Sequence, residues 1–283
     1  MSYQYITTKK IDQLDTLFIT HPKFDAQITL FGAQILSFIP AGETDVLWLS
    51  DTAQLSGDRP IRGGAPLCWP WFGPATGIYE GEPQHGYVRN VIWQLKAVEE
   101  SEDKVILRLS PILPQPLTEK LGLQLEVTYE FSDALNMTMN TQNISQQERE
   151  LSQAIHSYFA LDDIKQSKLL GLKDSSFLDK LTNKSQKQTQ DVILTAATDR
   201  VYLNHESELI LESPNRSLLI TGQGHDSVVV WNPWQDGAKV MADFDDLGYL
   251  NMMCVEMANT QSLVLSPGES HSMTQTVNIK KPA

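Results

Sequence analysis

Hydrophobic and polar positions alternate in short segments along most of this chain, and a period of two residues is typical of β-strands. The clearest case lies in residues 121–145, where apolar side chains occupy every second position over 123–131 and again over 135–139. Residues 132–134, Ser-Asp-Ala, favour a turn between the two halves. The segment is therefore expected to form an antiparallel hairpin.

Other short segments rich in branched and aromatic residues are also expected to be strands. They are 27–39, 45–50, 91–98, 104–110, 152–161, 207–213, 216–222, 226–232, 251–257 and 270–279. No long stretch keeps a helical period, although residues 243–250 are expected to form one helical turn. The pattern predicts an all-β fold with a single domain over residues 1–283, built as a sandwich of large antiparallel sheets.

Composition narrows the classes of function that fit this fold. The chain has 283 residues and a net charge of −13, which disfavours a broad basic surface and with it nucleic-acid binding. There is no long apolar run and no N-terminal signal core, so a cytoplasmic protein without a membrane partner is expected, with a monomer as the default. The two cysteines, Cys68 and Cys254, are expected to be free thiols.

Residues 59–74, RPIRGGAPLCWPWFGP, fit neither a helix nor a strand. Gly and Pro interrupt both elements, yet the segment also carries large aromatic residues and Arg62. A surface linker would be polar. The segment is therefore expected to fold back as a loop, with Trp69, Trp71 and Phe72 packed on the sheet.

Two ionisable residues stand on strands that are otherwise apolar. In 152–161, His156 shares a face with apolar neighbours, and in 251–257 Glu256 shares a face with Cys254 while the opposite face is apolar too. A buried carboxylate is costly unless it is paired or hydrogen-bonded. Glu256 is therefore either half of a structural salt bridge or a general base, and His156 either a hydrogen-bonded core residue or a catalytic group.

Three further places carry polar or aromatic groups that suit a polyhydroxylated ligand. His85 and Arg89 would share a face of an extended segment, or else lie in a solvated loop. Asp199 can accept hydrogen bonds from hydroxyls or form a surface ion pair. Trp231 and Trp234 can flank a sugar ring or pack at a sheet edge. Motifs for zinc, a nucleophilic serine, a P-loop or a dinucleotide are missing, so no metal site is expected.

Six ordered segments resemble the hexose-6-phosphate mutarotases, or glucose-6-phosphate 1-epimerases, a branch of the aldose 1-epimerase superfamily. The segments are PIRGGAPLCWPWFGP (60–74), HGYVRN (85–90), HSYF (156–159), TDRVY (198–202), VVWNPW (229–234) and CVE (254–256). The resemblance implies a one-domain β-supersandwich of the galactose mutarotase type, without a metal or organic cofactor. It also implies an isomerase that interconverts the α and β anomers of a hexose 6-phosphate, with glucose 6-phosphate as the expected substrate.

The resemblance also assigns roles to residues. His156 matches the general acid and Glu256 the general base, one on each side of the sugar ring. Four residues match positions that line the sugar-phosphate pocket: Arg62, His85, Arg89 and Asp199. A base that takes the proton of the C1 hydroxyl and an acid that protonates the ring oxygen would open the hemiacetal. Which arginine holds the phosphate, and whether Arg59 joins it, stays open.

Two other functions fit the same scaffold. An aldose 1-epimerase acting on unphosphorylated sugars would use the same acid–base pair, and Arg62 with Arg89 favours the phosphosugar over this alternative because guanidinium groups bind phosphate well. A non-catalytic sugar-binding or regulatory protein is the second, since fold does not fix function. A purely structural sandwich would leave Glu256 unexplained.

Overall fold

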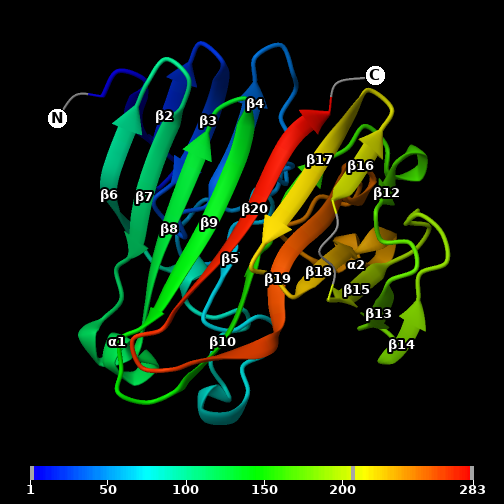
Figure 1. Cartoon of the computed structure of the whole chain (residues 1–283). Coiled ribbons are helices and arrows are strands. Elements are labelled where there is room, and N and C mark those ends of the chain that lie inside the picture. Colours follow the sequence, from blue (N-terminus) through cyan, green and yellow to red (C-terminus); the bar gives the residue numbers. More distant parts are fainter. Residues whose placement is uncertain (1–2, 205–207, 281–283) are drawn as a thin grey trace.

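Three antiparallel sheets form most of the computed structural model, which describes residues 3–204 and 208–280 (Figure 1). Two of the sheets have eight strands each and the third has four. This confirms the all-β class and the sandwich of large sheets that the alternating pattern predicted.

The sheet in front in Figure 1, which we call the β20 sheet, has the strand order β12-β16-β17-β20-β9-β8-β7-β6. The predicted hairpin of 121–145 is confirmed as β8 and β9, in which Phe131 pairs with Leu135 beside the turn. The strands of this sheet are β6 (Trp93–Glu100), β7 (Val105–Pro111), β8 (Leu123–Phe131), β9 (Ala134–Asn143), β12 (Lys168–Leu170), β16 (Leu209–Ser213), β17 (Arg216–Gln223) and β20 (Ser270–Lys280).

The second eight-stranded sheet, which we call the β19 sheet after its longest strand, has the order β14-β13-β15-β18-β19-β10-β5, and β11 also pairs with β19. Its strands are β5 (Leu67–Cys68), β10 (Arg149–Ile155), β11 (Tyr158–Ala160), β13 (Ser176–Asp179), β14 (Lys184–Lys187), β15 (Thr198–Leu203), β18 (Ser227–Asn232) and β19 (Met252–Leu265).

The four-stranded sheet lies behind β6–β9 of the β20 sheet (Figure 1). The ring centroids of Phe24 and Phe38 lie 6.1 and 5.9 Å from that of Phe131 on β8, which joins the two layers. The strands of this sheet are β1 (Ile6–Ile11), β2 (Leu14–His21), β3 (Phe24–Thr29) and β4 (Ile35–Pro40).

One connected hydrophobic core runs between the layers and takes residues from all three sheets. In the first half of β19 alternate residues enter this core: Met253, Val255 and Met257. The Ser157 hydroxyl donates to the side chain of Gln275, so a buried hydrogen bond also links the β19 sheet to the β20 sheet. The opposite face of β19, which carries Cys254 and Glu256, points away from this core.

Helices are few and short, as the missing helical period predicted. Residues 3–204 and 208–280 contain two α-helices of seven residues each, α1 (Gln115–Leu121) and α2 (Trp234–Val240). The same residues contain four 3₁₀ turns: η1 (Gly77–Tyr79), η2 (Val88–Asn90), η3 (Ile164–Gln166) and η4 (Gly248–Asn251). In the described part of the chain, no helix is long and apolar enough to cross a membrane.

Several predicted boundaries are wrong, each for a local reason. Residues 27–39 form β3 and β4 rather than one strand, because Gly32 (φ 73°) and Ala33 (φ 48°) turn the chain between them. Residues 45–50 make only isolated bridges. The strand expected over 152–161 is interrupted at His156, and β19 continues well past residue 257.

The loop of residues 59–74 folds inward as expected, although Leu67–Cys68 adds the short strand β5 to the β19 sheet. Trp69 is fully buried, and its indole N–H donates to Thr141 Oγ1 at 3.0 Å. Phe72 packs on the β19 sheet beside Cys68. Trp71 differs from the prediction, because its ring stacks on Tyr79 of a neighbouring loop.

Candidate active site

Strand pairing places a row of side chains across one face of the β19 sheet. The Cα partners are Tyr158 with Cys254, Cys254 with Trp231, and Trp231 with Asp199. Directly paired residues of antiparallel strands point to the same face. The four side chains therefore share the face that turns away from the core, on β11, β19, β18 and β15 respectively.

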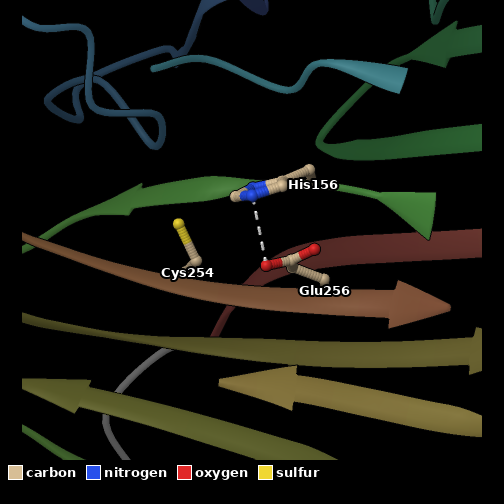
Figure 2. A group of neighbouring side chains, drawn as sticks. All are labelled: His156, Cys254 and Glu256. Atoms are coloured by element: carbon tan, nitrogen blue, oxygen red, sulfur yellow. Dashed lines mark ion pairs between the residues drawn. The ribbon is translucent and has the colours of Figure 1, made fainter. Parts of the chain in front are cut away.

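Glu256 lies two residues beyond Cys254 on β19, so it shares this face. Its side chain is only 1% exposed. His156 lies between β10 and β11, and its ring stacks on Tyr158 with centroids 4.9 Å apart. The Nε2 atom of His156 lies 3.4 Å from Oε1 of Glu256 (Figure 2). The acid and base candidates thus contact each other directly at the floor of the site, rather than standing apart.

Burial shifts both members of this pair toward their neutral forms. It lowers the pKa of His156 well below its ordinary value, and His85, Arg89 and Arg62 lower this pKa further. Burial likewise raises the pKa of Glu256 well above its ordinary value. Both shifts favour the neutral forms, an uncharged imidazole and a protonated carboxyl group, over the charged pair.

Arg62 reaches the site from the loop between β4 and β5. Its Nη1 donates to the hydroxyl of Tyr158 at 3.1 Å, and its Nη2 lies 3.3 Å from Oδ2 of Asp243. The side chains of Arg62 and Asp243 are 26% and 19% exposed, so their ion pair is partly shielded from water. Arg62 is thus held in a fixed position beside the row on the sheet.

His85 and Arg89 come from the loop before β6, which forms a turn and η2 rather than the extended segment considered above. His85 has φ 65°, and its Nδ1 accepts the backbone N–H of Gly73 at 3.1 Å. That bond keeps the ring neutral with its proton on Nε2. Burial, with Arg89 and Arg62, lowers the pKa of His85 to about 3. Arg89 donates to the carbonyl of Gln84 at 2.8 Å.

All six residues proposed from the sequence line one cavity of about 700 Å³, a volume that suits a small ligand. They are Arg62, His85, Arg89, His156, Asp199 and Glu256. Trp231 also lines the cavity, whereas Trp234 packs on Tyr249 with ring centroids 5.3 Å apart. Two further cations, Arg59 and Lys180, lie along its wall.

Several residues of the site had no assigned role in the sequence analysis, among them Asp243 and Cys254. Asp243 lies in the acidic segment 243–246, and nothing in that segment pointed to Arg62, which is 181 positions away along the chain. Cys254 was recognised only as a free thiol and an apolar neighbour of Glu256. Its Sγ atom, a ring nitrogen of His156 and a carboxylate oxygen of Glu256 all lie within 4.8 Å of one another.

Within residues 3–204 and 208–280, this is the only group of three or more His, Cys, Asp or Glu side chains that could hold a metal ion. No sequence motif indicates this group, because His156 lies about 100 positions from the other two residues and the spacing matches no metal-binding pattern.

Known proteins resemble this chain over its whole length. The family model for aldose 1-epimerase matches residues 15–278. A protein of Escherichia coli named "Putative glucose-6-phosphate 1-epimerase" is 36% identical over 282 residues, which cover 98% of this chain and 90% of the relative. A Salmonella typhimurium protein of the same name is 34% identical, with 98% of this chain and 94% of the relative covered.

Solved structures agree with this similarity. A crystal structure described as a "putative mutarotase" from Salmonella typhimurium matches with a TM-score of 0.92 and 30% identity, covering 100% of this chain and 96% of the other. The galactose mutarotase-like fold is thereby confirmed. The chain belongs to the aldose 1-epimerase family, as its motifs predicted.

Proposed function

We propose that this protein is an isomerase that interconverts the α and β anomers of a hexose 6-phosphate, with glucose 6-phosphate as the expected substrate. The observation that carries this proposal is the contact of His156 with Glu256 on the floor of a cavity that also contains Arg62 and Arg89. The names of the relatives from Escherichia coli and Salmonella typhimurium support the same substrate.

The chemistry needs one proton acceptor and one proton donor near a single carbon atom. The hydroxyl oxygen and the ring oxygen of the sugar are both bonded to C1, so two groups 3.4 Å apart can serve both oxygens. One group removes the hydroxyl proton while the other protonates the ring oxygen, and the C1–O5 bond breaks. Rotation about C1–C2 and the reverse proton transfers close the ring as the other anomer.

We expect the phosphate of the substrate to bind at Arg62 and Arg89. The Nε groups of Arg62 and Arg89 are buried and have no hydrogen-bond partner among the described residues, so each retains a donor for an anion. A phosphate there would offset the charges that now lower the pKa of His156. Substrate binding is therefore expected to shift the shared proton from Glu256 toward His156, which then acts as the acid.

Hydroxyl groups of the sugar would meet hydrogen-bond donors and acceptors on the remaining walls. His85 offers its Nε2–H, because Nδ1 is already engaged by Gly73. Asp199 offers carboxylate oxygens from β15, and Trp231 offers the face of an aromatic ring beside it. Such groups orient the ring, and orientation supplies a large share of catalysis.

We infer that the enzyme works in the cytoplasm as a monomer without a cofactor. The acid–base route calls for no cofactor. Among the described residues both cysteines are buried free thiols, which suits the reducing cytoplasm. The charge of −13 disfavours nucleic-acid partners, and the enzyme is proposed to act as a monomer on one small molecule.

Anomer exchange followed by NMR tests the function directly. Magnetisation transfer between the α and β C1 protons of glucose 6-phosphate would be recorded with the wild type, His156→Ala and Glu256→Gln, and with glucose as the control sugar. We expect acceleration by the wild type, and a loss of about 10²–10⁴-fold in each variant. Full activity in both variants would refute the assigned pair.

The control sugar separates the two alternatives. Equal acceleration with glucose would mean an aldose 1-epimerase for unphosphorylated sugars and would contradict the role of the arginines. Binding of glucose 6-phosphate without any acceleration would identify a sugar-binding protein on this scaffold instead.

A further inference from the structure

Three donor groups of different chemical type converge beneath the sugar-binding cavity. They are the imidazole of His156, the thiol of Cys254 and the carboxyl of Glu256, and Figure 2 shows His156 on one segment facing Cys254 and Glu256 on the neighbouring strand. Cys254 and Glu256 share a face because they alternate on β19, and His156 lies over them. The acid–base mechanism gives the thiol no task.

The spacing of the three donors fits a zinc ion. In a tetrahedral zinc site, bonds of about 2.0–2.3 Å place neighbouring ligand atoms about 3.3–3.8 Å apart. The His156 Nε2 and Glu256 Oε1 atoms already stand at 3.4 Å. No donor pair in the group exceeds 4.8 Å. The Cys254 sulfur would therefore have to approach by at most about 1 Å, which corresponds to a rotation of about 30° about its Cα–Cβ bond, a departure from the preferred rotamer that costs little.

Charge and burial also suit a dication in this position. A Zn²⁺ ion with one thiolate and one carboxylate forms a neutral group, which is the form that a buried site tolerates best. Glu256 has a buried oxygen, Oε2, without a hydrogen-bond partner among the described residues. The nearby charge of Arg62 is offset by Asp243. His156 and Glu256 both border the cavity, so a water molecule could take the fourth position.

We propose that His156, Cys254 and Glu256 form an inhibitory site for Zn²⁺. When the ion binds, the S–H bond of Cys254 and the O–H bond of the neutral Glu256 carboxyl group break, Zn–S and Zn–O bonds form, and both protons pass to the solvent. The imidazole and carboxylate are then occupied by the metal and cannot exchange protons with a sugar. The inhibition rests on the proposed function, whereas the binding of zinc does not. Hard Mg²⁺, which prefers oxygen ligands, is not expected to bind.

Cobalt absorption spectroscopy tests the site without any sugar. Co²⁺ would be added to the wild type, to Cys254→Ala and to Cys68→Ala, and then displaced by Zn²⁺. Cys68 is the matched control, because it is equally buried in the same sheet but belongs to a different cluster of side chains. We expect a thiolate-to-cobalt charge-transfer band in the wild type and in Cys68→Ala, and its loss in Cys254→Ala.

Inhibition is measured separately with the NMR exchange assay. Zn²⁺ is expected to inhibit the wild type, and Cys254→Ala is expected to raise the inhibitory zinc concentration by more than about tenfold, since even loss of an outer partner of a metal site costs that much. A cobalt complex without the thiolate band, or one that survives in Cys254→Ala, would overturn the proposal. If the wild type accelerates no anomer exchange, the proposed function fails while the spectrum still decides whether the metal site exists.

Discussion

Arg62, which is proposed to hold the phosphate, is itself held by an acid. Asp243 contacts its Nη2 atom at 3.3 Å, and the hydroxyl of Tyr158 accepts from Nη1. The two contacts have opposite consequences for a bound phosphate. Asp243 fixes the guanidinium in place, but its negative charge also repels the ligand. Positioning is expected to dominate, because a free arginine side chain loses much rotamer entropy when it binds.

Asp243→Asn is therefore expected to raise KM for glucose 6-phosphate by about five- to tenfold, equivalent to about 1 kcal/mol, with kcat changed by less than about twofold. Steady-state rates from the NMR exchange assay give both constants. Asp246→Asn removes the same charge from an exposed neighbour and is the matched control. A lower KM in Asp243→Asn would mean that repulsion is the larger effect and would refute the positioning role.

His85 makes stability depend on pH. Its pKa falls from 6.5 to about 3 on folding, so below pH 6.5 the unfolded chain binds a proton that the folded protein does not. The folded state should therefore lose about 1.4 kcal/mol per pH unit from pH 6.5 toward pH 3, or about 2 kcal/mol between pH 7 and pH 5. His85→Asn should remove this loss, and asparagine tolerates the positive φ of the site.

Urea unfolding of both proteins at pH 7 and pH 5 measures the difference. The difference between the two pH dependences of stability reports the titration of His85 together with its effect on the pKa of His156. If the free energy of unfolding fell equally with pH in the wild type and in His85→Asn, the His85 ring would take up its proton in the folded state at no cost. Loss of the hydrogen bond from the Gly73 N–H would allow this.

Site residues could be predicted from the sequence where they interrupt the hydrophobic pattern of their own strand. A carboxylate at position 256 stands out because its neighbours on β19 are apolar on both faces. Asp243 does not stand out, because an acidic residue in a loop is ordinary, and only the fold brings it to Arg62. Cys254 likewise fits its apolar surroundings. A side chain whose importance comes from a distant partner leaves no local signal.

Among the elements, the loop of residues 59–74 depends on glycine at position 64. Gly64 has φ 63°, and a Cβ atom there would lie 2.2 Å from the carbonyl oxygen of Ile35 on β4. The glycine therefore lets the loop approach the sheet edge, where Ala65 pairs with Ile35. Arg62 lies two residues before Gly64, so the same close packing of the loop on β4 positions the Arg62 side chain at the cavity.

Gly64→Ala is expected to destabilise the protein by more than about 3 kcal/mol, because backbone strain and a backbone clash add together. Gly42→Ala is the control: Gly42 also has a positive φ, 81°, but a Cβ atom there would meet nothing within 4 Å. Strain alone should cost about 1–2 kcal/mol in the control. Equal urea midpoints for the two variants would show that the loop shifts away from Ile35 at little cost in stability.

Whole elements escaped prediction where the apolar period is weak. All four residues of β14, KSQK, are exposed, and β1 exposes most of its length, because both are edge strands with little to bury. The hairpin of β8 and β9 was predictable since its strands bury every second side chain. The interruption of the strand at His156 could not be predicted. The apolar alternation in the sequence continues across His156, although the hydrogen-bonded strand pairing stops at Ile155 and resumes at Tyr158.

For the whole molecule, net charge and local charge act in opposite directions. The chain carries a charge of −13, yet Arg59, Arg62, Arg89 and Lys180 border one cavity. The overall field repels a phosphorylated sugar at long range, and the local cations attract it at contact. Selectivity for the phosphate therefore has to come from short-range hydrogen bonds, which geometry controls, rather than from steering by the field.

The continuity of the core bears on the single-domain prediction for residues 1–283. One hydrophobic cluster includes Phe38 of the four-stranded sheet, Phe131 of the β20 sheet and Val255 of the β19 sheet. If any one of the three sheets unfolded, the apolar face of another would be exposed to water. The stabilities of the three sheets are therefore coupled. We expect one cooperative thermal transition, with coincident midpoints by far-ultraviolet circular dichroism and tryptophan fluorescence. Two resolved transitions would mean that β1–β4 unfolds as a separate unit and that the chain contains two domains.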